Sequence, residues 1–312
     1  MEHSNETSTN ISAVMWDRVK TSNLYGGDII RLTRLMEPLA EKHARHMLEN
    51  SDAINMEFTE NMFKVTDAFL NSSIAWMEIN EESQRYDSSS KVLSSVDSVG
   101  YLLLTTLPTS GCLSGKHNFT LSLLTVQIVN LDTDCEQLAC FSFSTGSICV
   151  PPVIYESLHK NTAANVATEF IIKNMEQSMF PNTMLTKQNN HSSIIGLSIA
   201  NGTPITIPKG KQSVSITFHH EELDRDIGSE YCVFWDLSGN NWSDNGCFYN
   251  PDLSNLYETT CNCYHLTNFG IIMDFTGNAD PFDVFLNYFS TVTLVISMIF
   301  IFSTEVVLFY LK

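Results

Sequence analysis

The chain has 312 residues, of which 43% are hydrophobic, and its 17 basic and 35 acidic residues give a formal net charge of -18. This apolar content is enough to bury one large core or two smaller ones, so a fully disordered chain is excluded. Because the acidic balance repels phosphate backbones, we also exclude nucleic acid as a partner.

The first third of the chain is predicted to be helical. Residues 1–25 are polar and rich in Asn, Ser and Thr, and we expect a linker or a disordered arm there. Residues 26–110 carry apolar side chains at helical spacing, which predicts a helical subdomain. Pro38 is expected to kink or divide its first helix. The three apolar sets are Ile29, Leu32, Leu35, Met36 and Leu39; Phe58, Met62, Val65 and Phe69; and Val92, Val96, Val99 and Leu103.

Beyond Pro108 the pattern changes to alternating apolar and polar residues, with β-branched residues and frequent turn residues. This pattern is typical of short antiparallel strands. A helical block followed by a run of strands predicts an α+β protein, with a β-sandwich subdomain over residues 111–276. The candidate strands are Phe119 to Val129, Ile194 to Ala200, Val214 to Phe218, Tyr231 to Trp235 and Phe269 to Phe275.

An apolar run near the end of the chain predicts one transmembrane helix over residues 283–311. Its Glu305 is explained either by a partner in a bundle of membrane helices or by a position at the cytoplasmic interface. Since the chain opens without a hydrophobic leader, we expect its natural start to lie upstream, or the gene product to be incomplete. We also expect the full product to continue past Lys312.

The cysteines and the glycosylation acceptor sequences point to the secretory pathway. All eight Cys lie between Cys112 and Cys263, and the C-x-C spacing of the last pair lacks the C-x-x-C pattern of structural zinc sites. We therefore expect disulfides, with no metal and no cofactor. Three pairings remain open for the last four cysteines, and three for Cys112, Cys135, Cys140 and Cys149. The acceptors for N-glycosylation are Asn5, Asn10, Asn71, Asn118, Asn190, Asn201 and Asn241.

The segment Tyr231 to Asp274 resembles the proteolysis-site (GPS) motif of adhesion G-protein-coupled receptors. In that motif two Cys and two Trp lead to the pattern C-x-C-x-H-L-[ST]-x-F. The matching residues are Cys232, Trp235, Trp242, Gly246, Cys247, Cys261, Cys263, His265, Leu266, Thr267 and Phe269.

The residues of this motif predict a reaction within the chain. In one extended strand Cys261, Cys263, His265 and Thr267 would share a face, with Leu266 on the other. We expect His265 to act as the general base for the Thr267 hydroxyl, which attacks the carbonyl carbon of Leu266. Such self-cleavage is a single turnover, so we do not expect an enzyme with an external substrate. The alternative is that these residues are merely packed in a strand and nothing is cut.

The resemblance implies a GAIN-like fold, with subdomain A over 26–110 and subdomain B over 111–276, including a GPS motif at 231–275. It further implies disulfides Cys232–Cys261 and Cys247–Cys263. After the cut, Thr267, Phe269, Ile272 and Met273 would belong to a tethered-agonist strand. His43, His46, His219 and His220 are assigned no role.

The receptor context follows from the same resemblance. It implies the plasma membrane with the N-terminal domain outside, an unknown extracellular ligand, and a G protein on the cytoplasmic side. The cleaved C-terminal fragment and the remaining membrane helices would be further partners. A polycystin-type channel subunit with the same motif, or an uncleaved single-span adhesion or decoy protein, are the alternatives.

Overall fold

The computed structural model describes residues 5–50, 56–103, 116–130, 139–154, 166–173, 179, 193–199, 205–208, 210, 212–220, 229–274, 293, 297 and 298. Within these residues, no helix is both long and apolar enough to cross a membrane. Apart from Thr293, Ser297 and Met298, the predicted membrane helix at 283–311 lies outside the described residues.

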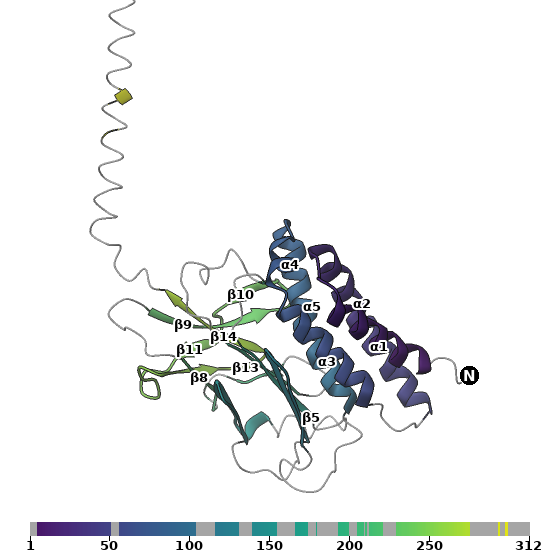
Figure 1. The fold of residues 1–312 in the computed structure, drawn as a ribbon. Coiled ribbons are helices and arrows are strands. Elements are labelled where there is room, and N and C mark those ends of the chain that lie inside the picture. The colour runs from purple at the N-terminus through teal and green to yellow at the C-terminus, as the bar shows by residue number, and fades with distance from the viewer. Residues whose placement is uncertain are drawn as a thin grey trace, which may run out of the picture. The chain divides into compact units, whose positions relative to one another are not determined.

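The N-terminal part of the chain is helical and forms one side of the folded unit (Figure 1). Helices α2, α3 and α5 contain the three apolar sets that the sequence singles out, except for Leu103, which follows the end of α5. Helix α2 continues through Pro38, so of the two expected effects of this proline, a kink or a division, the division does not occur. The helices are α1 (Asn5–Thr21), α2 (Gly26–Asn50), α3 (Met56–Leu70), α4 (Ser73–Met77) and α5 (Glu82–Tyr101).

Helix α1 corrects the expectation of a linker or disordered arm over residues 1–25. Ser8, Ser12, Met15 and Val19 are buried, and they recur at helical spacing along one face. The helix packs against α3, and Asn61 of α3 donates a hydrogen bond to Ser12 Oγ at 3.4 Å. The buried stripe consists largely of small hydroxyl residues, which a search for apolar periodicity does not detect.

The C-terminal part is built from two antiparallel sheets with a short two-stranded ladder beside them. The larger sheet has seven strands in the order β1-β2-β5-β6-β14-β9-β10, and the smaller has five in the order β11-β12-β8-β4-β3. Strand β13 pairs with β7. The strands are β1 (Lys116–Thr120), β2 (Leu124–Asn130), β3 (Ala139–Phe143), β4 (Gly146–Val150), β5 (Val166–Ile172), β6 (Ile194–Ile199), β7 (Ile205–Thr206), β8 (Val214–His219), β9 (Ser229–Asp236), β10 (Asn241–Ser243), β11 (Cys247–Tyr249), β12 (Glu258–Cys263), β13 (His265–Leu266) and β14 (Asn268–Asp274).

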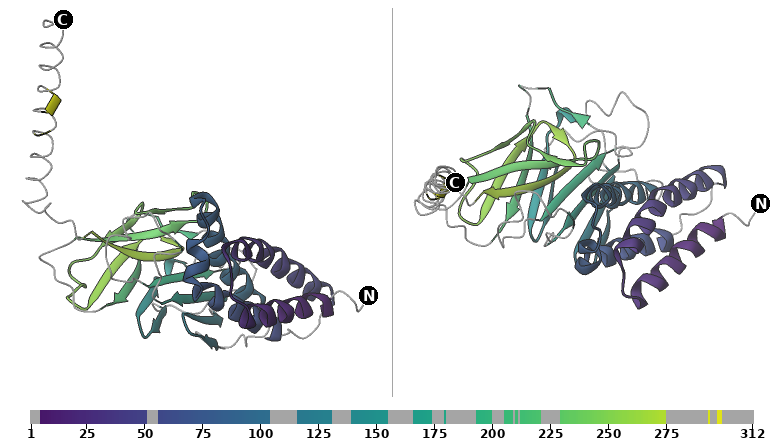
Figure 2. Two further views of the ribbon diagram at one scale, coloured as in Figure 1. Left: turned by 45° about the horizontal axis from the view of Figure 1, so that its top comes forward. Right: turned by 90° about the horizontal axis from the view of Figure 1, so that it is seen from above.

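The seven-stranded sheet is the middle of three layers (Figure 2). One face packs on the helices through residues such as Val126 and Phe170, and the other packs on the five-stranded sheet through residues such as Ile171 and Ile195. The helical layer therefore lies directly against strands of the sandwich subdomain. This arrangement agrees with the predicted α+β fold of a helical part followed by a sandwich.

One of the predicted strands differs from the structure, and one open cysteine pairing is resolved. The single strand expected from Phe119 to Val129 is a hairpin, in which β1 and β2 pair from Lys116↔Val129 to Thr120↔Thr125. The turn at Leu121–Leu123 has the sequence Leu-Ser-Leu, so no Gly, Asn or Pro marks it. Among the four cysteines whose pairing was open, Cys140 and Cys149 form a disulfide between β3 and β4. Cys112 and Cys135 lie outside the described residues.

Gly100 is the point of closest approach between α5 and β5, and it provides a test of this packing. A methyl group at Gly100 would lie 2.4 Å from Thr168 Cγ2, whereas one at Gly27 of α2 meets nothing within 4 Å. We expect Gly100→Ala to destabilise the protein by about 1–3 kcal/mol, because α5 must move away from the sheet. Gly27→Ala is the matched control and should be neutral or slightly stabilising. Equal thermal unfolding midpoints for the two variants would contradict this packing.

Candidate functional site

The predicted cleavage site lies where the chain crosses from one sheet to the other. Strand β12 belongs to the five-stranded sheet and β14 to the seven-stranded sheet. In between, His265 and Leu266 form β13, which pairs with Thr206 and Ile205 of β7. The extended segment expected here is therefore not one continuous strand. The strand alternation is interrupted at Tyr264 and again at Thr267, because the chain changes sheets there.

Two disulfides fix the strand that enters this crossing. Cys232 of β9 is joined to Cys261 of β12, which links the two sheets, and the Cα atoms are 5.7 Å apart. Cys247 and Cys263 face each other on β11 and β12 and form the second disulfide. These are the pairs that the resemblance implies. The last disulfide lies two residues before His265, so the backbone has little freedom where the crossing begins.

His265 is half-buried in a pocket made by aromatic rings and the second disulfide. Its ring contacts Phe234 edge-on, with centroids 4.3 Å apart, and stacks at 5.6 Å on Phe269 of β14. Its Nε2 lies 3.7 Å from Cys247 Sγ. Burial lowers the pKa of His265 below 6.5, and a hydrogen bond with the Asn245 backbone opposes this shift only in part. The imidazole is therefore neutral at neutral pH, as a general base must be.

The turn before β11 approaches this imidazole closely. Gly246 has φ +85, a left-handed conformation that a side chain disfavours, and an added methyl would lie 3.4 Å from His265 Cδ2. The Gly246 carbonyl accepts a hydrogen bond from Tyr264 N at 2.9 Å. Gly246 thus allows the turn to fold over His265 and ties it to the start of the crossing.

Thr267 is held by its neighbours on both sides. Its backbone carbonyl accepts a hydrogen bond from Leu197 N of β6 at 3.3 Å. Its hydroxyl donates to the backbone carbonyl of Trp235 in β9, with a distance of 3.5 Å between the two oxygens. No hydrogen bond joins the His265 ring to the Thr267 hydroxyl in this part of the described chain. A proton transfer between them therefore requires rotation of at least one of these side chains.

The strand after Thr267 is central in its sheet and well packed. Strand β14 lies between β6 and β9, and Phe269 and Ile271 are each 1% exposed. Both belong to the core between the two sheets. Gly270 faces the opposite side, where the ring of Trp242 passes over it. The side chains of Ile272 and Met273, which the resemblance places in the agonist, lie outside the described residues.

The remaining predicted residues are not part of this site. Asn10, Asn71, Asn118 and Asn241 are exposed, as N-glycosylation requires, and the side chains of Asn5, Asn190 and Asn201 lie outside the described residues.

His43 is stacked on Phe58 in the helical core, where burial lowers its pKa to about 4. Among the residues that the structure describes, no group of three His, Cys, Asp or Glu could hold a metal ion.

Sequence reasoning missed two groups that shape the site. Phe234 contacts His265, and the backbone carbonyl of Trp235 accepts a hydrogen bond from the Thr267 hydroxyl. Both residues lie 30 or so positions upstream of the crossing, on a strand that only folding brings beside it. The alternation in β9 is one signal for these two residues, because it predicts that the Phe234 and Trp235 side chains lie on opposite faces of the sheet.

Two family models match the chain. One, described as GPS, GAIN subdomain B, matches residues 120–277, which is just over half of the 312 residues. The other, described as the GAIN subdomain A of AGRL2-4, matches residues 1–103. The second match includes the residues of α1, in agreement with the structure.

Similar proteins include human adhesion G-protein coupled receptor G2, 32% identical over 138 residues, which are 42% of this chain and 13% of the receptor. Latrophilin Cirl of Drosophila mojavensis is 24% identical over 305 residues, covering 85% of this chain and 17% of latrophilin. The chain thus spans less than a fifth of the length of either relative. The full extracellular region of zebrafish Gpr126/Adgrg6 shares the fold, with a TM-score of 0.59 at 16% identity over 85% of this chain and 35% of that one. The chain therefore belongs to the GAIN family, with GAIN subdomain A followed by GAIN subdomain B and its GPS motif.

Proposed function

We propose that this chain is the extracellular GAIN region of an adhesion G-protein-coupled receptor and that it cuts its own backbone between Leu266 and Thr267. The observation that carries this proposal is the position of Thr267. It lies at a short crossing between two sheets, next to a neutral His265 that packs on a disulfide, and directly before a central strand. The matched receptors support the same context.

The reaction has two steps. His265 takes the proton of the Thr267 hydroxyl, whose oxygen then attacks the carbonyl carbon of Leu266. The Leu266–Thr267 amide bond breaks, the nitrogen receives the proton, and an ester joins the Leu266 carbonyl to the Thr267 oxygen. Water hydrolyses this ester to a carboxylate on Leu266 and a free hydroxyl on Thr267. Because each chain reacts once with itself, no external substrate is required.

The two fragments should stay together after the cut. Strand β14 keeps its hydrogen bonds to both neighbouring strands, and Phe269 and Ile271 stay buried between the sheets. Burying each of these side chains contributes about 1.5–3 kcal/mol. The upstream fragment therefore holds the downstream fragment without a covalent bond.

Cleavage is tested by producing the full chain through the secretory pathway with a different tag at each end. We expect two bands on denaturing electrophoresis, each carrying one tag, and one band for Thr267→Ala, which lacks the nucleophile. Thr267→Ser keeps a hydroxyl and should still be cut. Thr259→Ala, a buried threonine on β12, is the matched control and should give two bands. A single full-length band for the natural sequence would refute the proposal.

The pH dependence of cleavage tests the role of His265. Its pKa lies below 6.5 in the folded chain, so the neutral form that accepts a proton persists to a lower pH than for an exposed histidine. We expect the rate of cleavage of pulse-labelled precursor to rise with pH and to level off below pH 6.5. The rate is measured after the precursor is shifted from acidic buffer into a series of buffers. A midpoint above 6.5 would argue against His265 as the base.

We further propose that β14 is the agonist of the complete receptor once the upstream fragment is pulled away. A strand with Phe269 and Ile271 exposed to water gains free energy by entering another apolar groove. A synthetic peptide of residues 267–280 should therefore activate the complete receptor. The same peptide with Phe269→Ala should be weaker, and equal activity of the two peptides would contradict a role for this buried side chain.

A further inference from the structure

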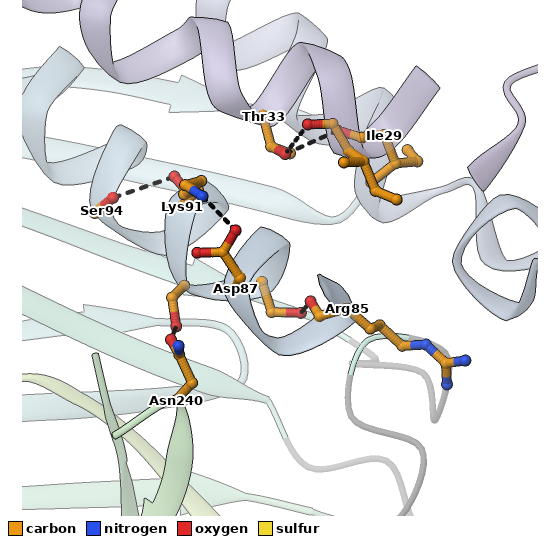
Figure 3. Close-up of polar contacts among 10 residues, drawn as sticks. Ile29, Thr33, Arg85, Asp87, Lys91, Ser94 and Asn240 are labelled. Carbon is orange, nitrogen blue, oxygen red and sulfur yellow. Dashed lines mark hydrogen bonds and ion pairs between the residues drawn. The ribbon is translucent and has the colours of Figure 1, made fainter. Parts of the chain in front are cut away.

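A serine on helix α5 contacts the sandwich subdomain beside the cleavage site. Trp235 Nε1 of β9 donates a hydrogen bond to Ser90 Oγ at 2.7 Å. Ser90 Oγ in turn donates to the side-chain oxygen of Asn240, in the turn between β9 and β10, and Figure 3 shows Asn240 directed toward α5. Ser90 is 7% exposed and Trp235 is 1% exposed. This hydrogen-bonded chain is therefore shielded from competing water.

The residues beside Ser90 on α5 make contacts of their own. The turn of α5 around it carries an ion pair between Lys91 and Asp87 (Figure 3). One residue earlier, Ser89 Oγ donates to the carbonyl of Arg85 and lies 3.1 Å from the carbonyl of Met179. Ser90 is thus an acceptor on a packed helix, and its contact with the Trp235 indole is separate from the contacts of its neighbours.

Trp235 links this helix to the nucleophile. Its ring packs edge-on against Tyr86 of α5, with centroids 5.9 Å apart, and against Trp242 of β10 at 5.4 Å. Its backbone carbonyl accepts the hydrogen bond from the Thr267 hydroxyl at 3.5 Å. One residue therefore contacts the helical layer with its side chain and the reacting residue with its backbone.

The 3.5 Å between the Thr267 hydroxyl and this carbonyl is longer than the distance of about 2.5–3.0 Å that is usual between the oxygens of an O–H···O hydrogen bond, so the bond is weak. A small displacement of Trp235 would remove the bond, whereas its presence favours one rotamer of Thr267. Because the bond is weak, the hydroxyl can give it up to His265 when the reaction begins. Keeping an attacking oxygen near its target raises the rate without adding any group to the reaction.

We propose that Ser90 is a positioning residue for self-cleavage, acting through Trp235, whose carbonyl orients the Thr267 hydroxyl. The inference rests on the proposed cleavage between Leu266 and Thr267. It makes the rate of that reaction depend on how α5 of subdomain A sits on β9 of subdomain B. Cleavage therefore reports correct docking of the two subdomains.

The test compares substitutions at two neighbouring serines of α5 in the full chain. Ser90→Ala removes the acceptor for Trp235, whereas Ser89→Ala removes a buried hydroxyl that contacts Arg85 and Met179 instead. The half-time for conversion of the precursor to its fragments is measured by pulse labelling and a chase. We expect this half-time to be about tenfold longer in Ser90→Ala than in the natural sequence. Ser89→Ala should keep the natural half-time, even if its thermal midpoint falls as far. Ser90→Thr retains the oxygen and should recover most of the rate.

A double-mutant cycle provides the second measurement. Trp235→Phe keeps the aromatic ring but removes the Nε1 donor, so it should slow cleavage as much as Ser90→Ala does. The double variant should be no slower than either single variant, because both remove the same interaction. If Ser90→Ala fails to fold, the same comparison is made between Trp235→Phe and Ser89→Ala.

The outcomes separate this inference from the function on which it rests. If the natural chain is not cut, the proposed cleavage itself is refuted. If it is cut, and Ser90→Ala and Trp235→Phe are cut as fast as Ser89→Ala, only the role of Ser90 is overturned. The role of Ser90 is also overturned if the double variant slows cleavage by the product of the two single effects. Ser90 and Trp235 would then affect the cleavage rate independently of each other.

Discussion

The whole site depends on a short crossing between two sheets that is anchored at both ends. Only Tyr264 to Thr267 lie between β12 in one sheet and β14 in the other, and sheets packed face to face are about 10 Å apart. The upstream end is fixed by disulfides at Cys261 and Cys263, and the downstream end by a central strand. Because the crossing is short and both of its ends are fixed, the backbone around Leu266 cannot change its conformation without a change in the surrounding fold. The backbone is thus fixed on both sides of the Leu266–Thr267 peptide bond.

Much of the fold could be predicted from the sequence, because periodicity reports burial on one face. Helices α2, α3 and α5 and strands β6, β8, β9 and β14 were found in this way. A search for apolar periodicity does not detect helix α1, since its buried face uses serine, and it merges β1 and β2 into one strand, because the Leu-Ser-Leu turn contains no Gly, Asn or Pro. Pattern reasoning works where burial and polarity agree along the chain. It fails where small hydroxyl residues are buried, as in α1, and where a hairpin turn lacks the usual turn residues, as between β1 and β2.

The site was predicted in its residues but not in its geometry. The motif gave His265, Leu266 and Thr267, and the resemblance implied the two disulfide pairs that the structure contains. The expectation of one extended strand does not include the bends at Tyr264 and Thr267, where the chain changes sheets. The contacts of Trp235 with Ser90 and Thr267 span 145 and 32 positions in the sequence. No local pattern encodes contacts at such separations, so only the folded chain reveals that subdomain A touches the site.

The two faces of β14 are unequal, and this decides how the strand can leave. On the side of the sandwich core, Phe269 and Ile271 are fully buried between the sheets. On the side of the helices, Gly270 has no side chain, and the ring of Trp242 covers it. Removing the helical layer would therefore leave Phe269 and Ile271 buried, whereas opening the sandwich exposes both of these apolar side chains. In the proposed mechanism, subdomain A controls when the bond is cut, through Trp235, whereas the packing of the two sheets controls when the cut strand is released. A force that separates β14 must act on the sandwich, and loosening α5 alone would leave the strand in place.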